Sequence, residues 1–158
     1  MSLNFKETLN SDLQFFAVKL STLDIIQSIK NFITDYYHGS VRFEDCTTEN
    51  RFILFGEYEL ARMIKSVIKE LTLSKTCAIS FNAEGEDFII SFIASNDSPP
   101  SEYSVNHLIA EAASFDLEIR SDGLRLDLVI PTHRFATCPI YNRNKLRFYD
   151  ALISVYSE

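Results

Sequence analysis

The sequence alternates single helices with pairs of strands, and this order limits the folds that the chain can adopt. Apolar residues three and four positions apart predict helices, which fall at 20–37, 57–73, 105–114 and 146–156. Runs rich in β-branched and aromatic residues predict strands, which fall at 40–44, 51–55, 77–83, 87–94, 117–120 and 124–130. A doubly wound parallel sheet would alternate single strands with helices. The paired strands instead predict an α+β fold, a two-layer sandwich of a mixed sheet with helices on one face.

Short turns between the strand pairs predict hairpins. Glycine-containing turns at 84–86 and 122–123 join the second and third pairs, and glycine readily supplies the positive φ that such turns need. A polar turn at 46–50 joins the first pair, so we expect those two strands to pair with each other. Phenylalanines at helix or strand spacing are predicted to lie mostly in the core: Phe15, Phe16, Phe32, Phe81, Phe88 and Phe92.

The composition is that of a folded domain with a sizeable core. The chain has 158 residues, of which 46% are hydrophobic and 23% charged, and this length fits one domain. A net charge of -7 argues against nucleic acid and anionic membranes as partners. No apolar run approaches the ~18 residues of a membrane-spanning helix, and 1–10 lacks the apolar core of a signal peptide. Three cysteines without paired spacing predict free thiols and a cytoplasmic location.

The scarcity of glycine excludes the common phosphate-binding loops. Such loops need glycine because only glycine lets the backbone approach a phosphate at unusual dihedral angles. The chain has four glycines, and no two lie close together: Gly39, Gly56, Gly85 and Gly123. A dinucleotide-binding fingerprint and a P-loop are therefore excluded.

Four segments, taken in order, resemble one known family. They are a hydrophobic strand, a glycine and a helix start at 52–60, the helix 60–71, the strand and loop 87–100, and the helix and hairpin 107–131. Together they resemble the ATP-binding catalytic domain of sensor histidine kinases. The resemblance covers about 20–131 and implies the histidine kinase-type ATPase fold, which is shared with gyrase and mismatch-repair proteins.

In this family, the helix after the first strand–glycine turn carries two asparagines four residues apart, and the second binds Mg2+. These positions fall on Ser66 and Glu70, which share one face of a helix. The resemblance thus implies that Ser66 and Glu70 are cofactor-binding positions and that Glu70 is the metal ligand, since a carboxylate can supply an oxygen to Mg2+. Ser66 is a poor substitute for asparagine. A solvated helix charge is the competing interpretation of Glu70.

The family's adenine-binding loop differs in composition here. Its positions fall on Ser95, Asn96 and Asp97, which the resemblance implies as further cofactor-binding residues. Asn96 matches the family, but Ser95 lacks the carboxylate that accepts strongly from the adenine amino group. Asp97 would repel a triphosphate if it lay near one. An ordinary polar turn is the alternative interpretation of this loop.

Other parts of the kinase machinery have no counterpart in the sequence. The lid after the loop is reduced to 100–106, and no glycine occurs between Gly85 and Gly123. The first histidine is His38, after the first helix of the domain, and His107 is expected at the surface near a helix start. We therefore predict no catalytic residue and no cofactor, or ATP and Mg2+ if the site is retained. If the chain is an enzyme, the resemblance implies a histidine kinase or phosphotransferase.

The chain continues beyond the point at which the kinase domain ends. We divide it into a linker segment at 1–19, a histidine kinase-like ATPase domain at 20–131 and a C-terminal extension with a helix at 132–158. The last helix carries an apolar stripe that must be buried on this domain or on a partner, and its members are Leu146, Tyr149, Leu152, Ile153 and Tyr156. A basic cluster at 143–147 is either solvated or docks an acidic partner.

Three functions remain open at this point. The first is a degenerate domain that serves as a docking, dimerisation or phosphotransfer-associated module in two-component signalling. Its partners would be a response regulator or another signalling protein, and a second copy of the chain in a homodimer. The second is an active sensor histidine kinase catalytic domain that binds ATP and Mg2+. The third is a stand-alone regulator that binds a partner protein.

Overall fold

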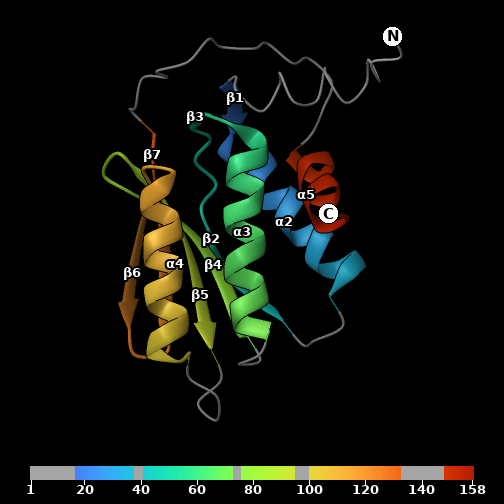
Figure 1. The fold of residues 1–158 in the computed structure, drawn as a ribbon. Coiled ribbons are helices and arrows are strands. Elements are labelled where there is room, and N and C mark those ends of the chain that lie inside the picture. Colours follow the sequence, from blue (N-terminus) through green and yellow to red (C-terminus); the bar gives the residue numbers. More distant parts are fainter. Residues whose placement is uncertain (1–16, 38–40, 73–75, 95–99, 133–147) are drawn as a thin grey trace, which may run out of the picture.

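The computed structural model describes residues 17–37, 41–72, 76–94, 100–132 and 148–158. Its elements in chain order are β1 (Val18–Ser21), α2 (Thr22–Tyr36), β2 (Arg42–Cys46), β3 (Phe52–Phe55), α3 (Glu57–Thr72), β4 (Thr76–Glu84), β5 (Asp87–Ala94), α4 (Glu102–Ser114), β6 (Glu118–Asp122), β7 (Arg125–Pro131) and α5 (Phe148–Tyr156). Helices α3 and α4 lie side by side over one face of the main sheet (Figure 1). The predicted α+β fold, with a mixed sheet and helices on one face, is confirmed. None of the described helices is long and apolar enough to cross a membrane.

The main sheet has five strands in the order β2-β4-β5-β7-β6. Strands β2 and β4 are parallel, whereas the other neighbours are antiparallel. The predicted hairpins β4–β5 and β6–β7 are confirmed. Their turns contain Gly85 at φ 57° and Gly123 at φ 59°, and glycine adopts this left-handed conformation without the steric cost of a Cβ atom.

The hairpin predicted between 40–44 and 51–55 is wrong. Strand β2 pairs with β4, and β3 pairs with β1 in a separate two-stranded sheet. Hydrogen bonds between the first residue of α2 and the residue that precedes β3 fix the position of β3. The backbone N–H of Arg51 donates to the Thr22 hydroxyl at 2.9 Å, and the Thr22 N–H donates to the Arg51 carbonyl at 2.9 Å. These bonds place β3 beside β1 and away from β2.

The N-terminus of α2 is fixed by a serine cap. Ser21 has extended backbone angles, and its hydroxyl accepts from the Asp24 N–H at 3.4 Å, which satisfies one of the unpaired N–H groups of the first turn. The observed helix therefore begins at Thr22, two residues after the predicted start, because 18–21 form strand β1. This strand starts inside the segment predicted as a linker.

The core lies between the helices and one face of the main sheet. Phe88, Ile90 and Phe92 alternate along β5 and are fully buried, as expected when every second side chain faces the helices. The ring of Phe81 stacks between Phe43 at 6.4 Å and Phe88 at 6.5 Å, measured between ring centroids. The predicted core positions of four phenylalanines are confirmed, namely Phe32, Phe81, Phe88 and Phe92. The other two, Phe15 and Phe16, lie outside the described residues.

The opposite face of the main sheet carries polar pairs around the buried Ile89 and Val129. Arg125 donates to Asp127 at 2.8 Å and to Ser91 at 3.1 Å. Arg120 donates to Glu118 at 3.0 Å. Alternating apolar and polar residues are typical of an antiparallel sheet with one face in water, and this pattern explains why the helices cover only the other face.

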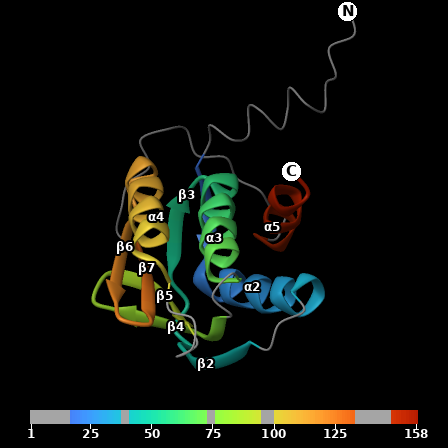
Figure 2. The ribbon, with the colours of Figure 1, turned by 60° about the horizontal axis from the view of Figure 1, so that its bottom comes forward.

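The C-terminal helix α5 packs against α2 and α3, on the side of α3 away from α4 (Figure 2). Its buried residues are Phe148, Ala151, Leu152 and Val155. The predicted apolar stripe is thus wrong, because the helix is rotated about its axis and buries a neighbouring face instead. Of its members, Leu152 is buried, Tyr149, Ile153 and Tyr156 lie at the edge of the contact, and Leu146 lies outside the described residues, as does the basic cluster 143–147.

Polar contacts hold both ends of α5. The Phe148 N–H donates to Asp24 Oδ2 at 3.1 Å at the first turn. At the last turn, Lys65 Nζ donates to the Val155 carbonyl at 2.8 Å. An acceptor at the start and a cation at the end of a helix complement its unpaired backbone groups and its dipole. Helices α2 and α3, against which α5 is buried, therefore also supply the groups that cap its two ends.

We expect one tyrosine in this contact to titrate late. The Tyr149 hydroxyl donates to Asp35 Oδ2 at 2.7 Å, and this hydrogen bond is the main cause that raises the pKa of Tyr149 from 10.0 to about 12. The folded state favours the protonated phenol. Its contribution to stability is therefore complete below pH 10, the unfolded pKa, and is lost as the pH rises toward about 12.

The titration can be followed by the ultraviolet absorbance of tyrosinate, with Tyr149→Phe to assign the late phase. Asp35→Asn should return that phase toward pH 10, the ordinary tyrosine pKa. Burial raises the pKa of Tyr58 as well, so the assignment would be contradicted by a late phase of undiminished amplitude in Tyr149→Phe.

Candidate functional site

Helix α3 carries the positions that the resemblance assigned to the cofactor. Its apolar side is fully buried against the sheet through Leu60, Met63, Ile64 and Val67, which confirms the predicted helical spacing. Ser66 and Glu70 lie one turn apart and are only partly buried. They are on the side of the helix that meets α4.

Helix α4 begins earlier than predicted. Ser101 is its N-cap, and the Ser104 N–H donates to the Ser101 hydroxyl at 3.1 Å. This cap starts the helix at Glu102 and not at 105. The connection from the end of β5 to α4 is therefore 95–101, and the predicted 100–106 lid is mostly helix. His107 consequently lies in the second turn.

Four side chains meet between the two helices, and we call them the α3–α4 cluster. The Ser66 hydroxyl donates to Glu111 Oε1 at 2.7 Å. One turn along each helix, His107 Nδ1 lies 4.0 Å from Glu70 Oε1. The His107 side chain is 57% exposed and the Glu70 side chain 25% exposed, so an ion pair between them would contribute at most about 1 kcal/mol.

The structure thus brings together some of the predicted site residues. Ser66 and Glu70 lie on one face of α3, as their spacing predicted. Ser95, Asn96 and Asp97 lie outside the described residues. The surface position of His107 is confirmed by its exposure. Glu111 was missed, because no local pattern distinguishes it and only the packing of α4 beside α3 shows its contact with Ser66.

Two features of the described residues near the α3–α4 cluster bear on the binding of a magnesium triphosphate. The part of the chain described here holds no group of three His, Cys, Asp or Glu side chains able to bind a metal ion. At the N-terminus of α4, the Ser104 N–H is already bonded to Ser101, and Glu102 adds a negative charge to the first turn. Phosphates bind helix N-termini through free N–H groups and a positive field, and both are weakened here.

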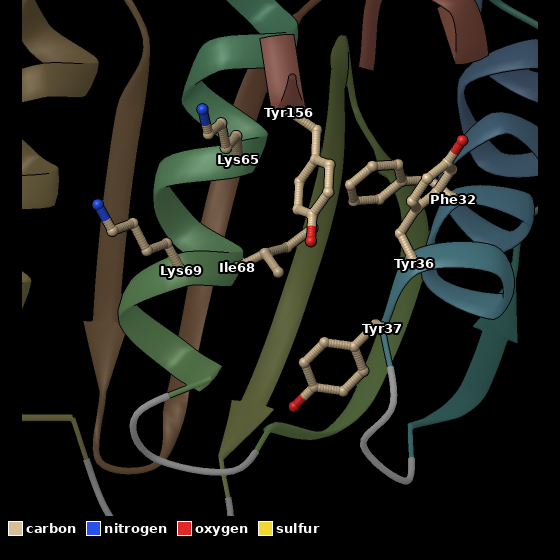
Figure 3. Close-up of a pocket in the computed structure, with 7 residues that line it drawn as sticks. All are labelled: Phe32, Tyr36, Tyr37, Lys65, Ile68, Lys69 and Tyr156. Atoms are coloured by element: carbon tan, nitrogen blue, oxygen red, sulfur yellow. The ribbon is translucent and has the colours of Figure 1, made fainter. Parts of the chain in front are cut away.

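A separate pocket of about 220 Å3 opens on the far side of α3 (Figure 3). Helices α2, α3 and α5 contribute to it, and its lining residues are Phe32, Tyr36, Tyr37, Lys65, Ile68, Lys69 and Tyr156. The two predicted cofactor-binding positions that the structure describes, Ser66 and Glu70, do not line it. We call it the aromatic pocket.

A mixed sheet with α3 and α4 side by side over one face is the arrangement expected for a histidine kinase-type ATPase fold. Solved structures agree. The histidine kinase AdeS of Acinetobacter baumannii matches with a TM-score of 0.52 and 11% identity, covering 82% of this chain and 74% of that one. The ATP-binding domain of PrrB from Mycobacterium tuberculosis matches with a TM-score of 0.53 and 12% identity, covering 73% and 97%. The fold that the resemblance implied is confirmed.

The likeness lies in the fold and not in the sequence. No family model matches the sequence, and no curated protein matches it significantly.

Proposed function

We propose that this chain is a degenerate histidine kinase-like ATPase domain that serves as a docking or dimerisation module, or one associated with phosphotransfer, in two-component signalling. The domain comprises 20–131, and 132–158 is an extension whose helix completes it. In this proposal it acts in the cytoplasm as a homodimer, with a response regulator or another signalling protein as its partner.

One observation carries the proposal. The hydroxyl of Ser66, at the position that matches the family's first asparagine, donates a hydrogen bond to Glu111 of the neighbouring helix α4. A second carboxylate, Glu70, lies one turn away beside His107. Carboxylates repel a triphosphate unless a cation lies between them, and the one basic side chain in the α3–α4 cluster is His107, which is a cation only when protonated. The retained fold with an altered cluster supports docking over turnover.

The alternative is an active domain in which Glu70 holds Mg2+ and the loop 95–97 contacts adenine. The same two carboxylates favour it, because Mg2+ is commonly bound by one or two carboxylates together with substrate phosphates. The alternative differs from the proposal in one measurable respect, which is binding of nucleotide.

We expect ATP with Mg2+ to leave the melting temperature unchanged at about 1 mM ligand. A domain that bound ATP with a Kd of about 10 μM would gain roughly 2.7 kcal/mol at that concentration. For a chain of this size, each kcal/mol is worth about 2–4 °C in Tm. Differential scanning calorimetry resolves a shift of that size easily.

The matched variant for this experiment is Glu70→Ala. A rise in Tm with Mg-ATP that Glu70→Ala abolishes would contradict the proposal and establish the active alternative. A rise that survives in Glu70→Ala would indicate nucleotide binding elsewhere. Unchanged melting curves for both proteins are the expected result.

A further inference from the structure

The aromatic pocket lies where α2 and α3 extend beyond the end of α5. Helix α5 has nine residues and α3 has sixteen, so α5 covers only part of the length of its neighbour. From the last turn of α5, the ring of Tyr156 extends into the space between Ile68 of α3 and Phe32 of α2 (Figure 3). After Tyr156, Glu158 pairs with Arg62 at 2.9 Å. Arg62 does not line the pocket, so this pair leaves the pocket open.

The walls of the pocket include three aromatic rings that contact one another. Phe32 and Tyr36 stack with 5.4 Å between their ring centroids, and Tyr156 meets Phe32 edge-on at 5.4 Å. The centroids of Tyr36 and Tyr156 lie 5.5 Å apart. These distances fall within the roughly 4.5–7 Å at which aromatic rings attract one another. The chain thus already places a ring of its own, that of Tyr156, against Phe32, and this contact indicates that the pocket suits aromatic rings.

The volume of the pocket limits the size of what it can hold. It measures about 220 Å3, which is more than the roughly 150 Å3 of an apolar cavity that binds benzene. Sites for drug-sized ligands measure roughly 300–1,000 Å3. One ring, or two fused rings as in indole, fits between these limits, and a nucleotide does not. Tyr36 is 37% exposed and Tyr156 is 49% exposed, so the pocket is accessible from solvent.

The two lysines that line the pocket are already engaged. Lys65 Nζ donates to the Val155 carbonyl at 2.8 Å, and Lys69 has an interaction of its own. Because both ammonium groups have partners, recognition depends mainly on the apolar and aromatic walls. A cationic ligand would in addition be repelled by both lysines. These observations favour a neutral ligand.

We propose that the aromatic pocket is a binding site for a small neutral aromatic molecule with one ring or two fused rings. The bound ring lies between Ile68 on one side and Phe32 and Tyr156 on the other. Because the walls come from α2, α3 and α5, a bound ring contacts all three helices and stabilises the position of α5. This site goes beyond the docking function proposed above and does not depend on it.

Indole is the probe for this site, because its fluorescence shifts to the blue when it leaves water and the chain contains no tryptophan. We expect a shift that saturates at one indole per chain, with a Kd on the order of 0.1–1 mM. Phenol should displace indole. Cyclohexanol has nearly the same size but no aromatic ring, and it should need a roughly two- to tenfold higher concentration, since aromatic pairs attract one another beyond the area they bury.

Two substitutions test whether the bound indole lies in the aromatic pocket. Ile68→Phe puts a larger side chain into the space and should weaken binding roughly tenfold, because it fills part of the volume. Tyr156→Ala removes one wall and should weaken binding roughly three- to tenfold. The matched controls are Ile109→Phe and Tyr103→Ala on α4, whose side chains are 41% and 82% exposed and do not line the pocket. Neither control should change the Kd.

The inference is overturned if indole shows no saturable binding, or if each variant has the same Kd as its matched control. It is also overturned if cyclohexanol displaces indole as effectively as phenol does, or if benzoate binds more tightly than phenol, since the ligand class would then be wrong. A peptide with a central tryptophan that binds more tightly than indole would indicate a docking surface for a protein, and would overturn the assignment to a small molecule.

The outcome is separable from that of the nucleotide experiment, because Ser66 and Glu70 do not line the pocket. Saturable binding of indole would stand whether or not Mg-ATP raises the melting temperature. Absence of indole binding would overturn only this inference and would leave the proposed function unchanged.

Discussion

Replacing Phe148 by alanine is expected to lower the free energy of unfolding by about 3–5 kcal/mol, the usual cost of truncating a fully buried phenylalanine. Phe148 is the first residue of α5 and is completely inaccessible to solvent. Its backbone N–H is also held by Asp24 of α2. If α5 is an integral part of the domain, the loss appears as a fall in Tm of roughly 6–20 °C.

The control for this experiment is Tyr103→Ala, which removes a ring that is 82% exposed and should change stability by no more than about 0.5 kcal/mol. A Tm for Phe148→Ala equal to that of the control would show that α5 does not contribute to the stability of the domain.

Replacing Phe81 by alanine is expected to cost about 3–5 kcal/mol as well, and a double-mutant cycle with Phe43→Ala should show coupling of about 0.5–1.5 kcal/mol. The two rings lie 6.4 Å apart across the parallel pair β2–β4. Coupling arises here only if those strands are neighbours. Urea unfolding of the wild type, both single variants and the double variant measures it.

This cycle tests the topology directly. In a hairpin of β2 with β3, Phe43 would face a different neighbour and its substitution would be additive with that of Phe81. The comparison cycle pairs Phe43→Ala with Ile119→Ala, because β6 lies at the other edge of the sheet and distant sites are usually additive within about 0.5 kcal/mol. Equal coupling in both cycles would contradict the parallel pairing.

The helices and the two glycine hairpins could be predicted because their signals are local. Apolar residues at helical spacing mark α3, and Gly85 and Gly123 supply positive φ at the turns they were expected to form. The partner of β2 could not be predicted in the same way. Which strand pairs with β2 depends on the hydrogen bonds between Thr22 of α2 and Arg51. These residues are far apart in the sequence.

In the candidate site, too, local spacing could be predicted from the sequence and contacts between helices could not. The spacing of Ser66 and Glu70 correctly predicted a shared face of α3, since four residues make about one helical turn. That Ser66 bonds to Glu111 follows from the placement of α4, and no spacing within the sequence encodes it. Likewise, the aromatic pocket joins Phe32, Ile68 and Tyr156 from three helices, none of which reveals a pocket by its own pattern.

The sequence by itself determined the order of the helices and of the strands after β1, the two-layer arrangement and the absence of glycine-rich phosphate loops, because periodicity and glycine content act locally on the backbone. Only the tertiary structure decided which strands pair, how α5 is rotated against α2 and α3, and that the apolar face of α5 is buried on this domain. Those outcomes depend on complementary packing between distant segments, where a shift of one residue exchanged Tyr149 for Phe148 as the buried ring.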